Sequence, residues 1–151
     1  MYPAGTTVTI SASAEPTHRF TGWSGDSSGT STSTAITLDR SKFAQANFSP
    51  KATQMITFPP PGDRTTNSPP FALNATASSG LPVSYTLLGG LATLSGDIVE
   101  ITGPGAISIQ ASQPGDAFFL PAAPVSQSFN VIAPVSLKYR GSSRTIIKHE
   151  Q

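Results

Sequence analysis

Short runs in which apolar and hydroxyl-bearing side chains alternate are the feature that most constrains the fold of this chain. In TTVTISASA, residues 6–14, Val8 and Ile10 are separated by a Thr and are followed by alternating Ser and Ala. Because successive side chains of a β-strand point to opposite faces, this pattern predicts a strand with one buried and one solvated face. Such runs are separated by turn residues, among them 13 Gly and 14 Pro. Helix-type periodicity is almost absent, so the sequence predicts an all-β chain.

The alternating runs fall into two groups on either side of a polar stretch. That stretch, SPKATQ at residues 49–54, holds Pro and Lys without apolar periodicity and is typical of a linker. We predict strands within residues 6–14, 34–38 and 43–48 before it, and within 55–58, 71–77, 83–87, 98–101, 106–111 and 125–131 after it. Several short strands at a spacing of about ten residues predict a small antiparallel sandwich in the second group.

These patterns divide the chain into two modules and a tail. We predict a first module at residues 1–50, a linker at 51–53 and a β-sandwich at 54–132. The remaining residues, 133–151, lose the alternation and gather Lys and Arg, so we interpret them as a basic tail and a candidate for disorder.

The charge and composition of the chain argue against several classes of partner. The 9 Lys and Arg residues and 8 Asp and Glu residues leave a formal net charge of +1. Without a strong positive field to attract phosphates, we predict no nucleic-acid partner. No apolar run approaches the roughly 18 residues of a membrane span, so we predict no membrane insertion. The absence of Cys excludes disulfides and thiolate metal sites.

Two stretches of the chain resemble known families. YPAGTTVTISASAEPTHRFTGWSGD followed by TAITLDRSKFAQANFSP, within residues 2–50, resembles the bacterial repeat of the divergent internalin B (InlB B-repeat) type. That family normally begins with a further hairpin, so the resemblance implies a truncated repeat. Residues 54–132 resemble the immunoglobulin-like modules found in arrays on bacterial surface proteins, through ITFPPPGD, FALNATASSGLPVSYTLLGGLATLSGD, ITGPGAISIQASQPGDAFFLPA and VSQSFNV.

The two resemblances imply a function in spacing and adhesion rather than in catalysis. They imply a location outside a bacterial cell or on its surface, although the chain shows no signal peptide of its own. The implied partners are neighbouring repeat modules of a larger chain, and a cell-surface protein or a glycan as ligand. We predict that the chain is not an enzyme and has no catalytic, cofactor-binding or metal-binding residues.

Trp23, the single Trp of the chain, admits two interpretations. A domain of about 50 residues buries a small fraction of its surface and needs large aromatic side chains to close a core. We therefore place Trp23 in the core and keep a sugar-binding platform as the weaker interpretation, because sugar sites usually combine several convergent groups. The predicted core residues are Phe20, Trp23, Phe48, Phe58, Phe71, Tyr85, Ile107, Ile109 and Phe129.

The alternative function is an accessory carbohydrate-binding module of an extracellular polysaccharide-degrading enzyme. Exposure of Trp23, Tyr85 and the aromatic residues of 117–119 on one common face would favour it.

Few residues are candidates for chemistry. His18 and His149 stand in different segments and form no metal-binding or nucleophile-activating pair. The Gly-Asp turns at Asp26, Asp63, Asp97 and Asp116 offer a single carboxylate each, whereas calcium requires several, so we interpret them as turns. Asp97 and Glu100 are the closest carboxylate pair, and we expect both to face water.

Overall fold

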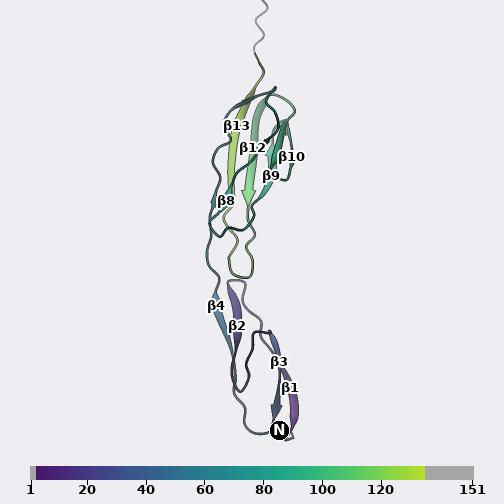
Figure 1. Ribbon diagram of the computed structural model, residues 1–151, viewed down its shortest axis with the longest axis vertical. Helices are drawn as coiled ribbons and strands as arrows, with labels where there is room; N and C mark the ends of the chain where they lie inside the picture. The colour runs from purple at the N-terminus through teal and green to yellow at the C-terminus, as the bar shows by residue number, and fades with distance from the viewer. Residues whose placement is uncertain (1–2, 135–151) are drawn as a thin grey trace, which may run out of the picture.

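The structure of the protein is a computed structural model that describes residues 3–134, so the predicted basic tail lies outside them except for residues 133 and 134. Within residues 3–134 the chain forms strands and no helix, which confirms the all-β prediction. The strands form two modules arranged end to end, with β1–β4 in the first and β5–β13 in the second (Figure 1).

The first module consists of two antiparallel pairs of strands. They are β1 (Thr6–Ser11), β2 (His18–Gly25), β3 (Ser33–Leu38) and β4 (Ala44–Pro50). Strand β1 pairs with β3, and β2 pairs with β4. Val8 lies opposite Ile36 in the first pair, and Phe20 lies opposite Phe48 in the second. Their alternating side chains leave Ile36 buried, whereas most other apolar residues of the module are partly exposed.

Strand β2 was not predicted from the alternating pattern, and a bulge explains why. The register of β2 against β4 shifts between Phe20 and Gly22, which inserts one extra residue into the strand. Phe20 and Trp23, three residues apart in sequence, therefore meet in space, with ring centroids 5.4 Å apart. A pattern of period two cannot reveal a strand in which the period is interrupted.

The second module contains nine strands in three sheets. Its strands are β5 (Ile56–Thr57), β6 (Arg64–Thr65), β7 (Phe71–Ala72), β8 (Thr76–Ala77), β9 (Ser84–Gly89), β10 (Ala92–Ser95), β11 (Ile98–Ile101), β12 (Gly105–Ser112) and β13 (Val125–Ile132). The sheet orders are β6-β13-β12-β9, β10-β11-β7 and β5-β8. One departure from the predicted antiparallel sandwich is the short β6, which runs parallel to β13.

The residues expected to form a single strand at 71–77 instead form two, β7 and β8. Strand β7 pairs with β11, whereas β8 pairs with β5. Between them Leu73 is buried, and its backbone N–H donates to the carbonyl of Asp97. The chain therefore changes partner within seven residues of continuous apolar alternation.

The core of the second module is built mainly on β11, β12 and β13. Val99, Ile107 and Ile109 are fully buried, and Phe129 and Phe58 are nearly so. Two edge-to-face ring pairs link the sheets and loops, Phe58 with Tyr85 at 5.7 Å and Phe71 with Phe129 at 5.8 Å. Burial of these side chains supplies the main stabilisation of this module.

Candidate binding surfaces

The first candidate surface is an apolar groove in the first module, next to Trp23. It has a volume of about 450 Å³ and is lined by Val8, Ile10, Ser11, Trp23, Ile36, Leu38, Lys42, Ala44 and Ala46. Trp23 is partly buried, and its indole Nε1 donates to the carbonyl of Ser31 over 2.9 Å. The hydrogen bond and the contact with Phe20 hold the indole in place as one wall of the groove. Trp23 is thus neither a fully buried core residue nor an aromatic side chain presented on a loop.

The charged residue of this groove is already paired. The Lys42 ammonium lies 2.7 Å from the Asp39 carboxylate and 3.9 Å from that of Asp26, and its side chain is only 16% exposed. The hydrogen bond from Lys42 lowers the pKa of Asp39 below its usual value. The groove therefore offers apolar surface, with little free charge to select an ionic ligand.

The Asp26 carboxylate, just after β2, binds residues of the segment that precedes β4. Its oxygens accept the backbone N–H of Phe43 over 2.9 Å and the Arg40 guanidinium over 2.8 Å. The hydrogen bond from Phe43 lowers the pKa of Asp26, and the charges of Arg40 and Lys42 lower it further. The carboxylate thus has protein partners on both oxygens.

Two of the other Gly-Asp carboxylates also bind backbone N–H groups. Asp116 accepts from Phe118 and Phe119 over 2.7 and 2.8 Å, and Asp63 accepts from Asn130 over 2.8 Å. Within residues 3–134, no cluster of three or more His, Cys, Asp or Glu side chains could hold a metal ion. Asp116 therefore caps its own turn, as interpreted from the sequence, whereas Asp63 binds strand β13, 67 positions away in the sequence.

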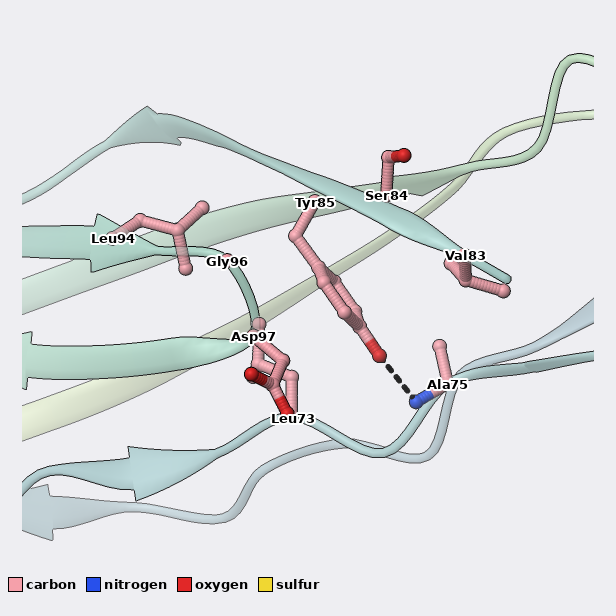
Figure 2. A pocket seen from close by; sticks show the side chains of 8 residues that line it. All are labelled: Leu73, Ala75, Val83, Ser84, Tyr85, Leu94, Gly96 and Asp97. Carbon is pink, nitrogen blue, oxygen red and sulfur yellow. Dashed lines mark hydrogen bonds between the residues drawn. The ribbon is translucent and has the colours of Figure 1, made fainter.

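The second candidate surface is a solvent-open hollow of about 570 Å³ in the β-sandwich (Figure 2). It is lined by Leu73, Ala75, Val83, Ser84, Tyr85, Leu94, Gly96 and Asp97. Figure 2 shows the Tyr85 ring reaching across it, where the phenol oxygen accepts the backbone N–H of Ala75 over 2.8 Å. Asp97 is the one carboxylate of the lining, while Glu100 lies outside it on β11 and is exposed. A single carboxylate beside a structurally engaged phenol does not form a paired acid and base.

The aromatic residues that would form a sugar-binding face lie apart. Trp23 borders the groove of the first module, and Tyr85 crosses the hollow of the second. Phe118, 56% exposed, lies between the modules, with the Arg19 guanidinium 5.0 Å from its ring centroid. The common face that would favour the carbohydrate-binding alternative is therefore not formed by these three residues.

The two histidines contribute no site within the part of the chain that the structure describes. His18 is exposed, and its Nδ1 lies 3.0 Å from the Thr17 hydroxyl. His149 lies outside the described residues.

The predicted core residues occupy three kinds of environment. Phe58, Ile107, Ile109 and Phe129 are buried, and Phe71 and Tyr85 are partly buried against the same core. Phe20 and Trp23 are partly buried in the first module. Phe48 corrects our expectation, because it is 41% exposed, with its ring edge-on to Phe20 at a centroid distance of 5.7 Å. With two strands to a sheet, the first module has too little backbone to cover both faces of this ring.

Comparison with known protein families gives a match for the first third of the chain. Residues 1–52 match the family model of the divergent InlB B-repeat domain, which confirms the resemblance of the first segment. The match covers the first module and ends at the junction with the second. A search of curated proteins found no match to the chain. The described residues contain no helix long and apolar enough to cross a membrane.

Proposed function

We propose that this chain is a pair of non-catalytic structural modules from a bacterial cell-surface or secreted protein, and that the pair acts as a spacer. The observation that carries the proposal is the match of residues 1–52 to the divergent InlB B-repeat domain, joined end to end with a second β-module (Figure 1). Two modules stacked along one axis lengthen a protein without requiring any chemistry. The partners of such a pair are the neighbouring modules of a larger chain.

The strand order of the second module supports its assignment as immunoglobulin-like. In that fold the first, second, fourth and fifth strands form one sheet, and the third, sixth and seventh form the other. Here β5, β7–β8, β10 and β11 supply the first set, while β9, β12 and β13 supply the second. The short β6 adds to the edge of β13 in the second set. Modules of this fold commonly serve as beads in extracellular arrays, which agrees with a location on the cell surface.

The side-chain chemistry supports a non-enzymatic role. The carboxylates of Asp26, Asp63 and Asp116 bind backbone N–H groups of their own loops or of neighbouring strands. The lining of the larger hollow brings no nucleophile, base and orienting group together. We expect no hydrolysis of esters, glycans or peptides by the purified chain.

Surface display of the full chain tests the spacer proposal. The chain is placed between a bacterial surface anchor and an epitope tag, and access of a large antibody-coated bead to the tag is measured. We expect bead binding to fall when residues 3–134 are deleted and to recover when two unrelated β-sandwich domains replace them. If the unrelated domains do not restore access while the native pair does, specific contacts of this pair are required and the spacer proposal is wrong.

A further inference from the structure

The junction between the two modules is hydrogen-bonded from both sides. The backbone N–H of Lys51 donates to the carbonyl of Thr17 in the first module over 2.8 Å. One residue later, Ala52 donates to the carbonyl of Phe118 and accepts from the N–H of Leu120, each over 2.8 Å. Ala52 and Phe119 thus form a parallel β-bridge between the modules. The segment predicted as a linker at 51–53 is therefore tied to the second module by a strand-like contact.

Two side chains reinforce this bridge. The Lys51 ammonium donates to the carbonyl of Asp116 over 2.8 Å. On the other side of the junction, Arg19 of β2 places its guanidinium 5.0 Å from the centroid of the Phe118 ring. A cation over an aromatic face at this distance contributes a modest attraction at an exposed site. These contacts link the first module itself, in addition to the connecting segment, to the loop at residues 113–122.

A pair of amide side chains, Gln113 and Gln54, holds the same loop from its inner side. Gln113 is only 5% exposed, and its side-chain oxygen accepts from the Gln54 amide over 2.8 Å and from the backbone N–H of Gly115. The Gln54 amide also donates to the carbonyl of Leu120 over 2.8 Å. Buried polar groups bonded at several positions resist movement, because any displacement leaves a donor or acceptor without a partner.

The loop itself is held in one shape by its own residues. Asp116 caps it by accepting the N–H groups of Phe118 and Phe119. Gly115 adopts φ +77°, and a Cβ atom there would collide with the backbone of Phe119 and Leu120. The partner of the connecting segment is thus a preformed surface rather than an adaptable one.

We propose that residues 113–122 form a socket that clamps residues 51–54 and fixes the orientation of the two modules, so that they move as one rigid body. This inference goes beyond the spacer function, because a spacer can be flexible or stiff. A three-residue polar connection without such contacts would leave the modules free to reorient. With the socket, the chain is a rod with a set angle between its halves.

Distance measurement between two spin labels tests the proposal on the full chain, which has no Cys of its own. The label sites are Thr9→Cys on β1 and Asn130→Cys near the far end of β13, both exposed positions outside residues 51–54 and 113–122. We expect a single narrow distance distribution. In the same labelled chain Ala52→Pro removes the N–H that bonds to Phe118 and is expected to broaden the distribution by about twofold or more, as for a short flexible connection. Ala52→Val is the matched control, since it keeps the N–H at an exposed position.

A second variant covers the case in which Ala52→Pro disturbs folding. Arg19→Ala with Phe118→Ala removes only the stacked pair and is expected to broaden the distribution to a smaller extent, while Phe118→Tyr keeps it narrow. A broad distribution in the unmodified labelled chain overturns the proposal, and so does a narrow one that all folded variants retain. A flexible junction would leave the surface-display result unchanged, so failure of this proposal and failure of the spacer proposal are distinguishable.

Discussion

Trp23 shows how a single large side chain stabilises a module that has almost no buried core. Ile36, 7% exposed, is the one buried large apolar residue in the described part of the first module, and the indole forms one wall of the groove beside it. We expect Trp23→Ala to lower the free energy of unfolding of this module by about 2–3 kcal/mol, less than for a fully buried aromatic residue. Far-UV circular dichroism during urea unfolding measures the loss.

Trp23→Phe serves as the control for that change. It keeps a ring against Phe20 but removes the hydrogen bond from Nε1 to Ser31, so its loss should be smaller. Equal and negligible losses in both variants would mean that the indole is not part of the stabilising packing.

We predict that the stability of the first module depends on pH through the carboxylates of Asp26 and Asp39. The pKa values of Asp26 and Asp39 are lowered in the folded state, by the N–H of Phe43 and by Lys42 respectively. The folded state therefore binds protons less readily than the unfolded state, and the contribution is complete above a pH of about 4 and lost below it. We expect the melting temperature of this module, followed by Trp23 fluorescence, to be flat near neutral pH and to fall in acid.

Asp26→Asn provides the comparison. It should melt at a lower temperature than the unmodified chain at neutral pH and show a shallower fall below a pH of about 4. Asp97→Asn should behave as the unmodified chain does, because Asp97 lies in the second module. An identical acid profile for Asp26→Asn and the unmodified chain would contradict the assigned role of this carboxylate.

Tyr85 is predicted to stabilise the second module through its hydroxyl as well as its ring. Tyr85→Phe leaves the ring against Phe58 but removes the acceptor for the N–H of Ala75. We expect a loss of about 1 kcal/mol in the free energy of unfolding, the usual net effect of one hydrogen bond. Chemical denaturation of the second module measures it, and a gain in stability would show that the bond is not made in solution.

At the scale of elements, the loop at residues 113–122 depends on one glycine. Gly115→Ala would be strained by its positive φ and would place a Cβ within 2.8 Å of the Leu120 carbonyl carbon. We expect it to destabilise the second module by about 1–3 kcal/mol from backbone strain alone, with a further loss from the collision. Gly96→Ala is a matched control, because Gly96 also has a positive φ of +63° but nothing lies within 4 Å of its Cβ. Thermal unfolding compares the two, and equal losses would show that Gly115 is needed for its φ alone.

Elements with an uninterrupted period of two were predictable, and those that bend or change partner were not. Strands β1 and β12 follow clean alternation, and Ile107 and Ile109 are fully buried as their phase requires. Strand β2 was missed because its bulge places Phe20 and Trp23 on one face at an odd spacing. The split of residues 71–77 into β7 and β8 depends on which neighbouring strand each half meets, and local propensity does not contain that information.

At the scale of the whole molecule, the two modules should differ in stability. The second module holds a contiguous buried cluster, whereas the first buries little apolar area between two-stranded sheets. Since hydrophobic stabilisation grows with buried area, we expect the first module to unfold at a lower temperature. Fluorescence of Trp23, the single Trp, reports the first module alone, and far-UV circular dichroism reports both. Coincident transitions would show that the junction couples the two modules into one cooperative unit.

The sequence by itself determined the β class, most strand positions and the resemblance of the first module, because each depends on short-range alternation, turn residues and ordered motifs. It also predicted the turn cap at Asp116, whose carboxylate accepts the N–H groups of Phe118 and Phe119. The contact of Lys51 and Ala52 with residues 116–120 was decided only by the tertiary structure. These residues are more than 60 positions apart in sequence, and their polar composition is equally suited to a free linker. Hydrogen bonds between such distant segments depend on the tertiary arrangement that places the loop beside the end of β4.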